Sequence, residues 1–181
     1  VTFTNPGNLT INASQTVSLT LAQLTAFEAG GTVTNNGTLN VTTASGDLSS
    51  DNLSVVDGTL TLSGATTLPD STSDMPTAIN AASQAITVAA SANLTGVTFT
   101  NPDNLTINSG QTVSMTAAQV SIFNGGGTLT NNGTLLVSAS GDLTGLNLSG
   151  VSNLTLTGNT TMTANQADSF AGQVVKGSHS I

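Results

Sequence analysis

The chain has 181 residues, of which 6% are charged, and its formal net charge is −8. Lys176 is the only lysine or arginine. Nucleic-acid binding is therefore excluded, because it needs several cationic side chains to displace counterions from phosphates. Cysteine is absent, which removes disulfides and thiol chemistry. No stretch approaches the roughly 20 apolar residues of a membrane-spanning helix, and no signal peptide is visible at the N-terminus.

The sequence repeats itself in two copies. The string VTFTNPGNLTIN at 1–12 returns as VTFTNPDNLTIN at 97–108 with one residue changed. Self-similarity at a fixed period is typical of repeat architectures, in which each unit packs on its neighbours. We therefore predict one continuous rod that consists of a full copy at 1–96 and an incomplete copy at 97–181.

Each copy contains short segments in which Val, Ile or Leu alternates with Thr, Ser or Asn, as in β-strands. In chain order these pieces begin near residues 9, 33, 60, 86, 105, 129, 154 and 174. The pattern predicts an all-β fold, a parallel β-solenoid (β-helix) of about 24-residue coils with short capping helices at its corners. About seven or eight coils at the strand spacing would give a rod of roughly 35 Å. We expect stacking of Leu9, Ile11, Val17 and Leu19 on Val33, Leu39 and Val41.

A motif of Thr, two residues, Gln, three residues and Phe recurs at three places. It is formed by Thr20/Gln23/Phe27, Thr116/Gln119/Phe123 and Thr163/Gln166/Phe170. Thr-x-x-Gln is a capping box for a helix N-terminus, and the Phe lies on the face of the Gln one turn later. Gly30, Gly125 and Gly172 follow, where a helix end favours a positive φ. Each motif thus predicts a corner helix of about two turns; the alternative is a ligand groove lined by the three Gln side chains.

A fourth motif is expected in the segment 66–80 but is not there. The segment reads TTLPDSTSDMPTAIN and contains Pro69 and Pro76. We expect a displaced helix in the following TAINAASQAITV, at 77–88. A variable insert in a regular array is also where we expect a specific function to lie.

Four aspartates are the weak candidates for a calcium site. Asp47 and Asp142 lie in two copies of the string ASGDL, and Asp70 and Asp74 lie in the insert. Calcium needs six to eight oxygen ligands, whereas an Asp beside Gly commonly caps a tight turn. We expect turn capping and no cofactor, with calcium as the alternative.

No catalytic residues are expected. His179 is the only histidine and lies on a predicted turn, so a Ser-His-Asp assembly has no support. Glycoside hydrolysis needs paired carboxylates, and Asp51 of the first copy is replaced by Leu146 in the second. We therefore expect the chain not to be an enzyme.

Thr-x-Thr pairs recur on the predicted strands. They are Thr59/Thr61, Thr128/Thr130 and Thr155/Thr157. Stacked on one flat face, such pairs would resemble the ice-binding surface of solenoid antifreeze proteins. Irregular coil lengths argue against a regular face, and a surface glycan is the other ligand that we consider.

The strings GVSNLTLTGNTTMTANQ (150–166), SMTAAQ and TNNGTL resemble the long Thr/Asn/Gly-rich repeat regions of bacterial extracellular surface proteins. These are giant adhesins, S-layer-like proteins and matrix-filament subunits, many of them β-solenoids. The resemblance implies a stalk or fibre outside the cell, at the cell surface or in a secreted filament. The Gly/Asp nonapeptide of calcium-binding repeat proteins is missing, so the resemblance does not imply calcium.

Ile181 falls on a predicted strand with no polar cap after it. An uncapped strand edge favours pairing with another strand. We therefore expect a structural or adhesive extracellular β-solenoid, as part of a longer repeat array or as a filament or surface-layer subunit stacking end to end. Its partner would be itself, as a homopolymer or as neighbouring repeats. The alternatives are a module that binds ice or glycan through a flat Thr face, and a functional amyloid-like fibre.

Overall fold

A computed structural model describes residues 1–169 and 174–181; Phe170 and Gly172 of the third predicted motif lie outside these residues. The strands are β1 (Leu9–Ile11), β2 (Thr16–Leu19), β3 (Val33–Asn35), β4 (Thr38–Asp47), β5 (Thr59–Thr67), β6 (Ala78–Asn80), β7 (Ile86–Val88), β8 (Ala92–Asn93), β9 (Thr98–Thr100), β10 (Leu105–Ile107), β11 (Thr112–Thr116), β12 (Leu129–Asn131), β13 (Thr134–Asp142), β14 (Asn153–Thr161) and β15 (Val174–Val175). The helices are α1 (Leu21–Gly30), α2 (Ala117–Gly126) and α3 (Ala164–Ser169), with a 3-10 turn η1 (Thr72–Asp74).

Every strand pair in the described part of the chain is parallel. One sheet runs in the order β12-β10-β7-β5-β4-β2, with β6 paired to both β5 and β9. A second sheet runs β15-β14-β13-β11-β8, and β1 pairs with β3. The predicted mostly β chain with parallel strands is therefore confirmed.

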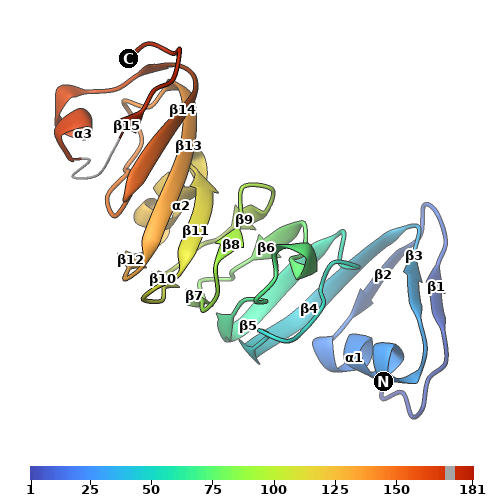
Figure 1. The fold of residues 1–181 in the computed structure, drawn as a ribbon. Coiled ribbons are helices and arrows are strands. Elements are labelled where there is room, and N and C mark those ends of the chain that lie inside the picture. Colours follow the sequence, from blue (N-terminus) through green and yellow to red (C-terminus); the bar gives the residue numbers. More distant parts are fainter. Residues whose placement is uncertain (170–173) are drawn as a thin grey trace.

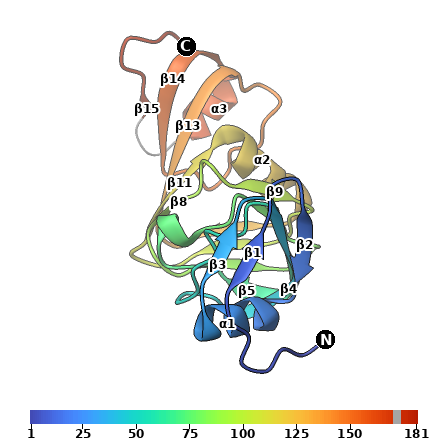
Figure 2. The ribbon, with the colours of Figure 1, turned by 90° about the vertical axis from the view of Figure 1, so that its right-hand side faces the viewer.

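The molecule is elongated, with the two termini at opposite ends (Figure 1). The view turned by 90° agrees, with β1 and α1 at one end and β14 and β15 at the other (Figure 2). Strands follow one another along the long axis in nearly the order of the sequence, so each segment contacts mainly the segments before and after it.

The register of the first pairs follows the alternation of the sequence. Leu9 lies opposite Val33, and Leu19 lies opposite Val41. Leu19 and Val41 are buried and Leu9 and Val33 are half-buried, while the outward Thr10 and Ser18 are exposed. Burying one such aliphatic side chain stabilises the fold by about 1.5–3 kcal/mol, so the parallel stack is held together by its inner row.

The spacing between paired residues is not a uniform 24. It is 24 from Leu9 to Val33, but 17 from Leu136 to Asn153. The long spacing contains helix α1 between the two strands, whereas the short one contains a turn without a helix. The pairs β1–β3 and β10–β12, which enclose the ten-residue helices α1 and α2, have the predicted mean spacing of 24, and the pair β13–β14 without a helix is shorter.

The helix expected in 77–88 is not formed. This stretch holds β6, a turn and β7, and β6 lies between β5 and β9. Ala82 and Ser83 have φ values of 49° and 60°, which a right-handed helix does not allow. The Asn80 side chain accepts a hydrogen bond from the Ala82 N–H at 3.1 Å and so stabilises the turn.

Candidate functional site

The recurring Thr-x-x-Gln motif forms a helix cap with two reciprocal hydrogen bonds. In α2 the Thr116 N–H donates to Gln119 Oε1 at 2.7 Å, and the Gln119 N–H donates to Thr116 Oγ1 at 3.2 Å. Helix α1 has the same pair of bonds between Thr20 and Gln23. The same exchange between Thr163 and Gln166 caps α3.

The Gln side chains have a second role, which the sequence did not suggest. Gln119 Nε2 donates to the backbone carbonyls of Leu94 and Val97, at 2.7 and 2.6 Å. Gln166 Nε2 likewise donates to the carbonyls of Leu143 and Leu146. Each amide therefore caps its own helix through its oxygen. Through its nitrogen it forms hydrogen bonds to a turn that lies more than 19 residues earlier in the sequence.

Because their amides are bonded to backbone groups in this way, the three Gln side chains do not form the alternative ligand groove. Gln23 also follows this pattern, since its Nε2 donates to the carbonyl of Val1 at 2.6 Å. They lie on three different helices spread along the molecule (Figure 1).

The Phe residues of the first two motifs pack against a second Phe. The rings of Phe123 and Phe99 lie 5.0 Å apart in an edge-to-face arrangement, and those of Phe27 and Phe3 lie 4.7 Å apart. Such pairs add to the stability given by burial. Each helix therefore anchors the start of its own copy, where the VTFTNP string lies.

The positive φ predicted for the glycines at these helix ends is not present at Gly30 or Gly125, and the close contacts involve the glycines Gly31 and Gly127. A Cβ on Gly127 would lie 2.5 Å from the backbone carbon of Asp103, and one on Gly31 would lie 2.8 Å from the Asn8 nitrogen. The helix end thus packs directly on the backbone that follows the Asn-Pro turn, and a side chain would separate the two.

Asp47 and Asp142 each cap a tight turn. Asp47 Oδ1 accepts from the Ser49 N–H at 3.0 Å, and Asp142 Oδ1 accepts from the Thr144 N–H at 2.9 Å. These backbone bonds lower the pKa of both carboxyls below the ordinary 3.8. The expected turn geometry is present, and Oδ1 of each Asp is engaged by the turn.

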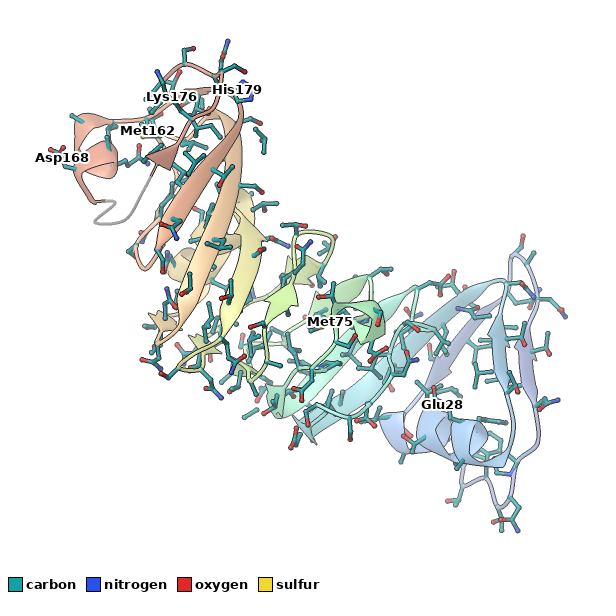
Figure 3. All side chains as sticks on the ribbon, in the orientation of Figure 1. Glu28, Met75, Met162, Asp168, Lys176 and His179 are labelled. Carbon is teal, nitrogen blue, oxygen red and sulfur yellow. The ribbon has the colours of Figure 1, made fainter. Side chains whose placement is uncertain are left out.

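Asp74 is the last residue of η1, and Asp70 lies two residues before its start. Ser73 Oγ donates to Asp74 Oδ1 at 3.3 Å, while the Asp70 N–H donates to the Ser49 carbonyl. Within residues 1–169 and 174–181, no group of three or more His, Asp or Glu side chains is placed to hold a metal ion. Figure 3 shows His179 beside Lys176 at the C-terminal end, on a turn closed by the His179 N–H and the Lys176 carbonyl.

Asp57 is a bridging residue that sequence reasoning missed. Its Oδ1 accepts from the Leu39 N–H at 2.9 Å and from Asn35 Nδ2 at 2.7 Å. In the second copy Ser152 Oγ takes the same place, bonded to the Leu135 N–H and to Asn131. The Leu39 bond is the main reason why the pKa of Asp57 lies below its ordinary value. Pairing the two copies residue by residue would have revealed the position, but not its bonds.

The Thr-x-Thr pairs do not stack on one another. Thr155 lies between Ser138 and Val175, and Thr61 lies beside Asn80. A different row does form: a single file of outward threonines runs across four neighbouring strands. The Thr file is Thr67, Thr87, Thr106 and Thr130.

No helix in the described residues is long and apolar enough to cross a membrane. Glu28 lies on α1 at the N-terminal end (Figure 3), and its partial burial, together with the nearby Asp51, raises its pKa above 4.5.

No family model matches the chain, and neither a curated protein nor a solved structure matches it.

Proposed function

We propose that the chain is a structural, adhesive rod outside the cell: a parallel β-solenoid that forms part of a longer repeat array, a filament or a surface layer. Its role is to span distance and to present an outer surface rich in Thr, Ser and Asn. Because each coil packs only on its neighbours, further coils lengthen the rod without changing its core.

The observation that carries the proposal is the junction between the two copies. Strand β9 at the start of the second copy pairs with β6, with Ile79 opposite Phe99. Strand β10 pairs with β7, with Ile86 opposite Leu105. One copy thus continues into the next through the same parallel ladder that holds each copy together, so further copies would lengthen the rod.

Electron microscopy of native material, labelled with an antibody to the chain, tests this function. Labelled filaments, stalks or a lattice outside the cell are the expected result. Label confined to the cell interior would overturn the proposed location. A second measurement tests the rod itself. Chains that carry one, two and three copies of residues 1–96 should give particles whose length increases by equal steps. Compact particles would contradict the rod-like arrangement.

The Thr file favours one second candidate, a face that binds ice or a glycan. Its members lie outward, between buried residues such as Ile86 and Val88 on the same strand. Ice-crystal shaping by the purified chain, or binding to a glycan array, tests this candidate. We expect Thr106→Lys to abolish such binding and Thr10→Lys, on the distant β1, to leave it unchanged.

A further inference from the structure

Two matching turns of the structure carry an Asn–Gly step. Asn36–Gly37 lies between β3 and β4, and Asn132–Gly133 lies between β12 and β13. Both asparagines are exposed. An asparagine loses its side-chain amide when the peptide nitrogen of the next residue attacks the carbon Cγ, and glycine hinders that attack least because it has no Cβ. Each turn therefore places the two reacting groups side by side and in contact with water.

The fold requires the glycine that makes each asparagine reactive. A Cβ on Gly37 would collide with the backbone oxygens of Asn12 and Gln15, in the turn between β1 and β2. Gly133 meets the same obstacle in the second copy. A larger residue after the asparagine would therefore separate two segments of the stack, and protection from the reaction has to come from another group.

That group is the side chain of Asn35, which holds the nitrogen that would attack. The Gly37 N–H donates to Asn35 Oδ1 at 3.1 Å. Asn35 Nδ2 in turn donates to the Val55 carbonyl at 3.0 Å and to Asp57 Oδ1 at 2.7 Å. For the attack on Asn36, the Gly37 nitrogen has to lose its proton and turn toward Cγ, so its bond to Asn35 has to break first.

The second copy has the same arrangement with a different outer partner. The Gly133 N–H donates to Asn131 Oδ1 at 3.1 Å. Asn131 Nδ2 donates to the Gly150 carbonyl at 2.8 Å and to Ser152 Oγ at 3.0 Å. The asparagine before each Asn–Gly step is thus held on its far side by the next segment of the chain, and its oxygen is fixed on the glycine nitrogen in both copies.

We propose that Asn36 and Asn132 are latent modification sites, and that the side chains of Asn35 and Asn131 control their conversion. When the bond to Asn35 opens, the Gly37 nitrogen loses its proton and bonds to Asn36 Cγ. The side-chain nitrogen of Asn36 leaves as ammonia, and a cyclic succinimide remains. Water then opens the ring to aspartate or isoaspartate. Each conversion consumes water, releases ammonia and adds a carboxylate to an exposed turn, whether or not the chain serves as a rod.

A further Asn–Gly step serves as an internal reference. Asn124–Gly125 lies within α2, where backbone N–H groups are engaged in the hydrogen bonds of the helix. Asn124 Nδ2 donates to the carbonyls of Asn147 and Ser149, at 3.0 and 3.1 Å. This step is independent of both bridging asparagines, so its rate of conversion should stay the same when either of them is replaced.

Peptide mass spectrometry of the folded chain tests the assignment, because exchange of the amide for a carboxyl changes the mass of the peptide. The chain is incubated in mildly alkaline buffer, which favours loss of the peptide proton. We expect Asn35→Ala to accelerate the conversion of Asn36 by roughly three- to tenfold, the effect of one lost hydrogen bond on a rate. Asn132 in the same molecule should be unaffected, and Asn131→Ala should give the reverse pattern.

Asn80→Ala is the matched control. Asn80 Oδ1 accepts from the Ala82 N–H at 3.1 Å, so this variant loses a turn bond of the same kind and length, but next to no Asn–Gly step. It should change the rate at neither Asn36 nor Asn132.

The native chain in urea supplies the rates without any fold. Both Asn36 and Asn132 should convert faster there than in the folded chain. Equal rates in the folded and unfolded native chain would overturn the proposal, as would a folded Asn35→Ala variant whose Asn36 converts no faster than before. A variant that accelerates Asn36, Asn132 and Asn124 together would also contradict it, because the cause would then be general unfolding and not the release of one bond.

Discussion

The side-chain amide of Gln119 joins two parts of the chain that are far apart in sequence. Its oxygen accepts from Thr116, and its nitrogen donates to the carbonyls of Leu94 and Val97. The side chain is buried, so each of these backbone groups would be left without a partner if the amide were lost. This single residue therefore fixes both the start of α2 and the turn before β9.

We expect Gln119→Glu to destabilise the fold at neutral pH by about 3 kcal/mol, because a buried carboxylate cannot donate to the two carbonyls. Burial raises the pKa of such a Glu. Its protonated form is favoured in the folded state, so stability should return as the pH falls through the raised pKa. Urea unfolding at several pH values measures this. Gln23→Glu, at a half-exposed position, should cost less; equal costs would contradict the double role of Gln119.

Asp57 and Ser152 give a second prediction, because the two copies use different residues for the same bridge. Asp57→Ala should cost about 1 kcal/mol through the lost bonds to Leu39 and Asn35, and Asp57→Ser should restore most of it. Denaturant midpoints of the two variants measure the difference. A serine variant as unstable as the alanine variant would contradict the equivalence.

The same carboxyl predicts a pH effect. Its pKa is lowered in the folded state, so its contribution is present above the unfolded value near 3.8 and is lost as the pH falls through the folded value. Asp57→Ser should therefore reduce the loss of stability below about pH 4, as measured by thermal unfolding at a series of acid pH values. The pKa values of Asp47 and Asp142 are also lowered, and both residues remain in the variant. The Asp57→Ser variant should therefore keep part of the loss of stability in acid.

At the scale of elements, the corner helices are fixed at both ends. The capping box sets the first turn, and the Phe pair anchors the face toward the core. The last turn packs on the backbone after the Asn-Pro turn, with Gly126 and Gly127 against Pro102 and Asp103. The helix and the strand edge therefore form one unit, and a substitution at the helix end should also destabilise the strand.

Two glycines of this helix end should respond in opposite ways to alanine. Gly127→Ala places a Cβ against three backbone atoms of Asp103 and Asn104, and we expect a loss of about 1–3 kcal/mol. Gly125→Ala meets nothing within 4 Å, and alanine is the better helix former by about 0.5–1 kcal/mol. Thermal unfolding of both variants measures the effect; a neutral Gly127→Ala would show that the close approach is not needed.

At the scale of the whole molecule, stability is spread over contacts between successive segments. Strand β9 joins the two copies, with Phe99 packed on both Ile79 and Phe123. In such a linear arrangement, stability is nearly a sum of segment terms and nearest-neighbour terms. A weakened junction should therefore uncouple the copies rather than unfold the chain in one step.

Phe99→Ala tests this uncoupling. Removal of a buried Phe costs about 3–5 kcal/mol, and we expect one unfolding transition to split into two, as seen by calorimetry. The same change at Phe3 is the control, since its ring is partly exposed and carries no preceding segment in this structure. Equal effects of the two substitutions would contradict the role of the junction.

The sequence by itself determined the corner helices, most of the strands and much of their register. Alternation of aliphatic and polar residues predicts strands whose inner rows stack, and Leu9 on Val33 and Leu19 on Val41 follow from it. The Thr-x-x-Gln spacing predicts the helix caps, because a capping box involves residues within one turn. These features depend on neighbours a few residues away, which a single sequence displays.

The tertiary structure decided the features that depend on contacts with the neighbouring segments of the stack. The strings at 77–88 and at 21–30 both contain good helix formers, yet only the second is helical, since the first is paired on both sides. The amide nitrogen of Gln119 donates to Val97, Gly127 approaches the backbone of Asp103, and the Leu39 N–H lowers the pKa of Asp57. In each case the partner lies about 20 positions away in the sequence. Phe99 is buried at 6% exposure because β6, about 20 residues earlier, pairs with its strand, which the string VTFTNP by itself does not reveal.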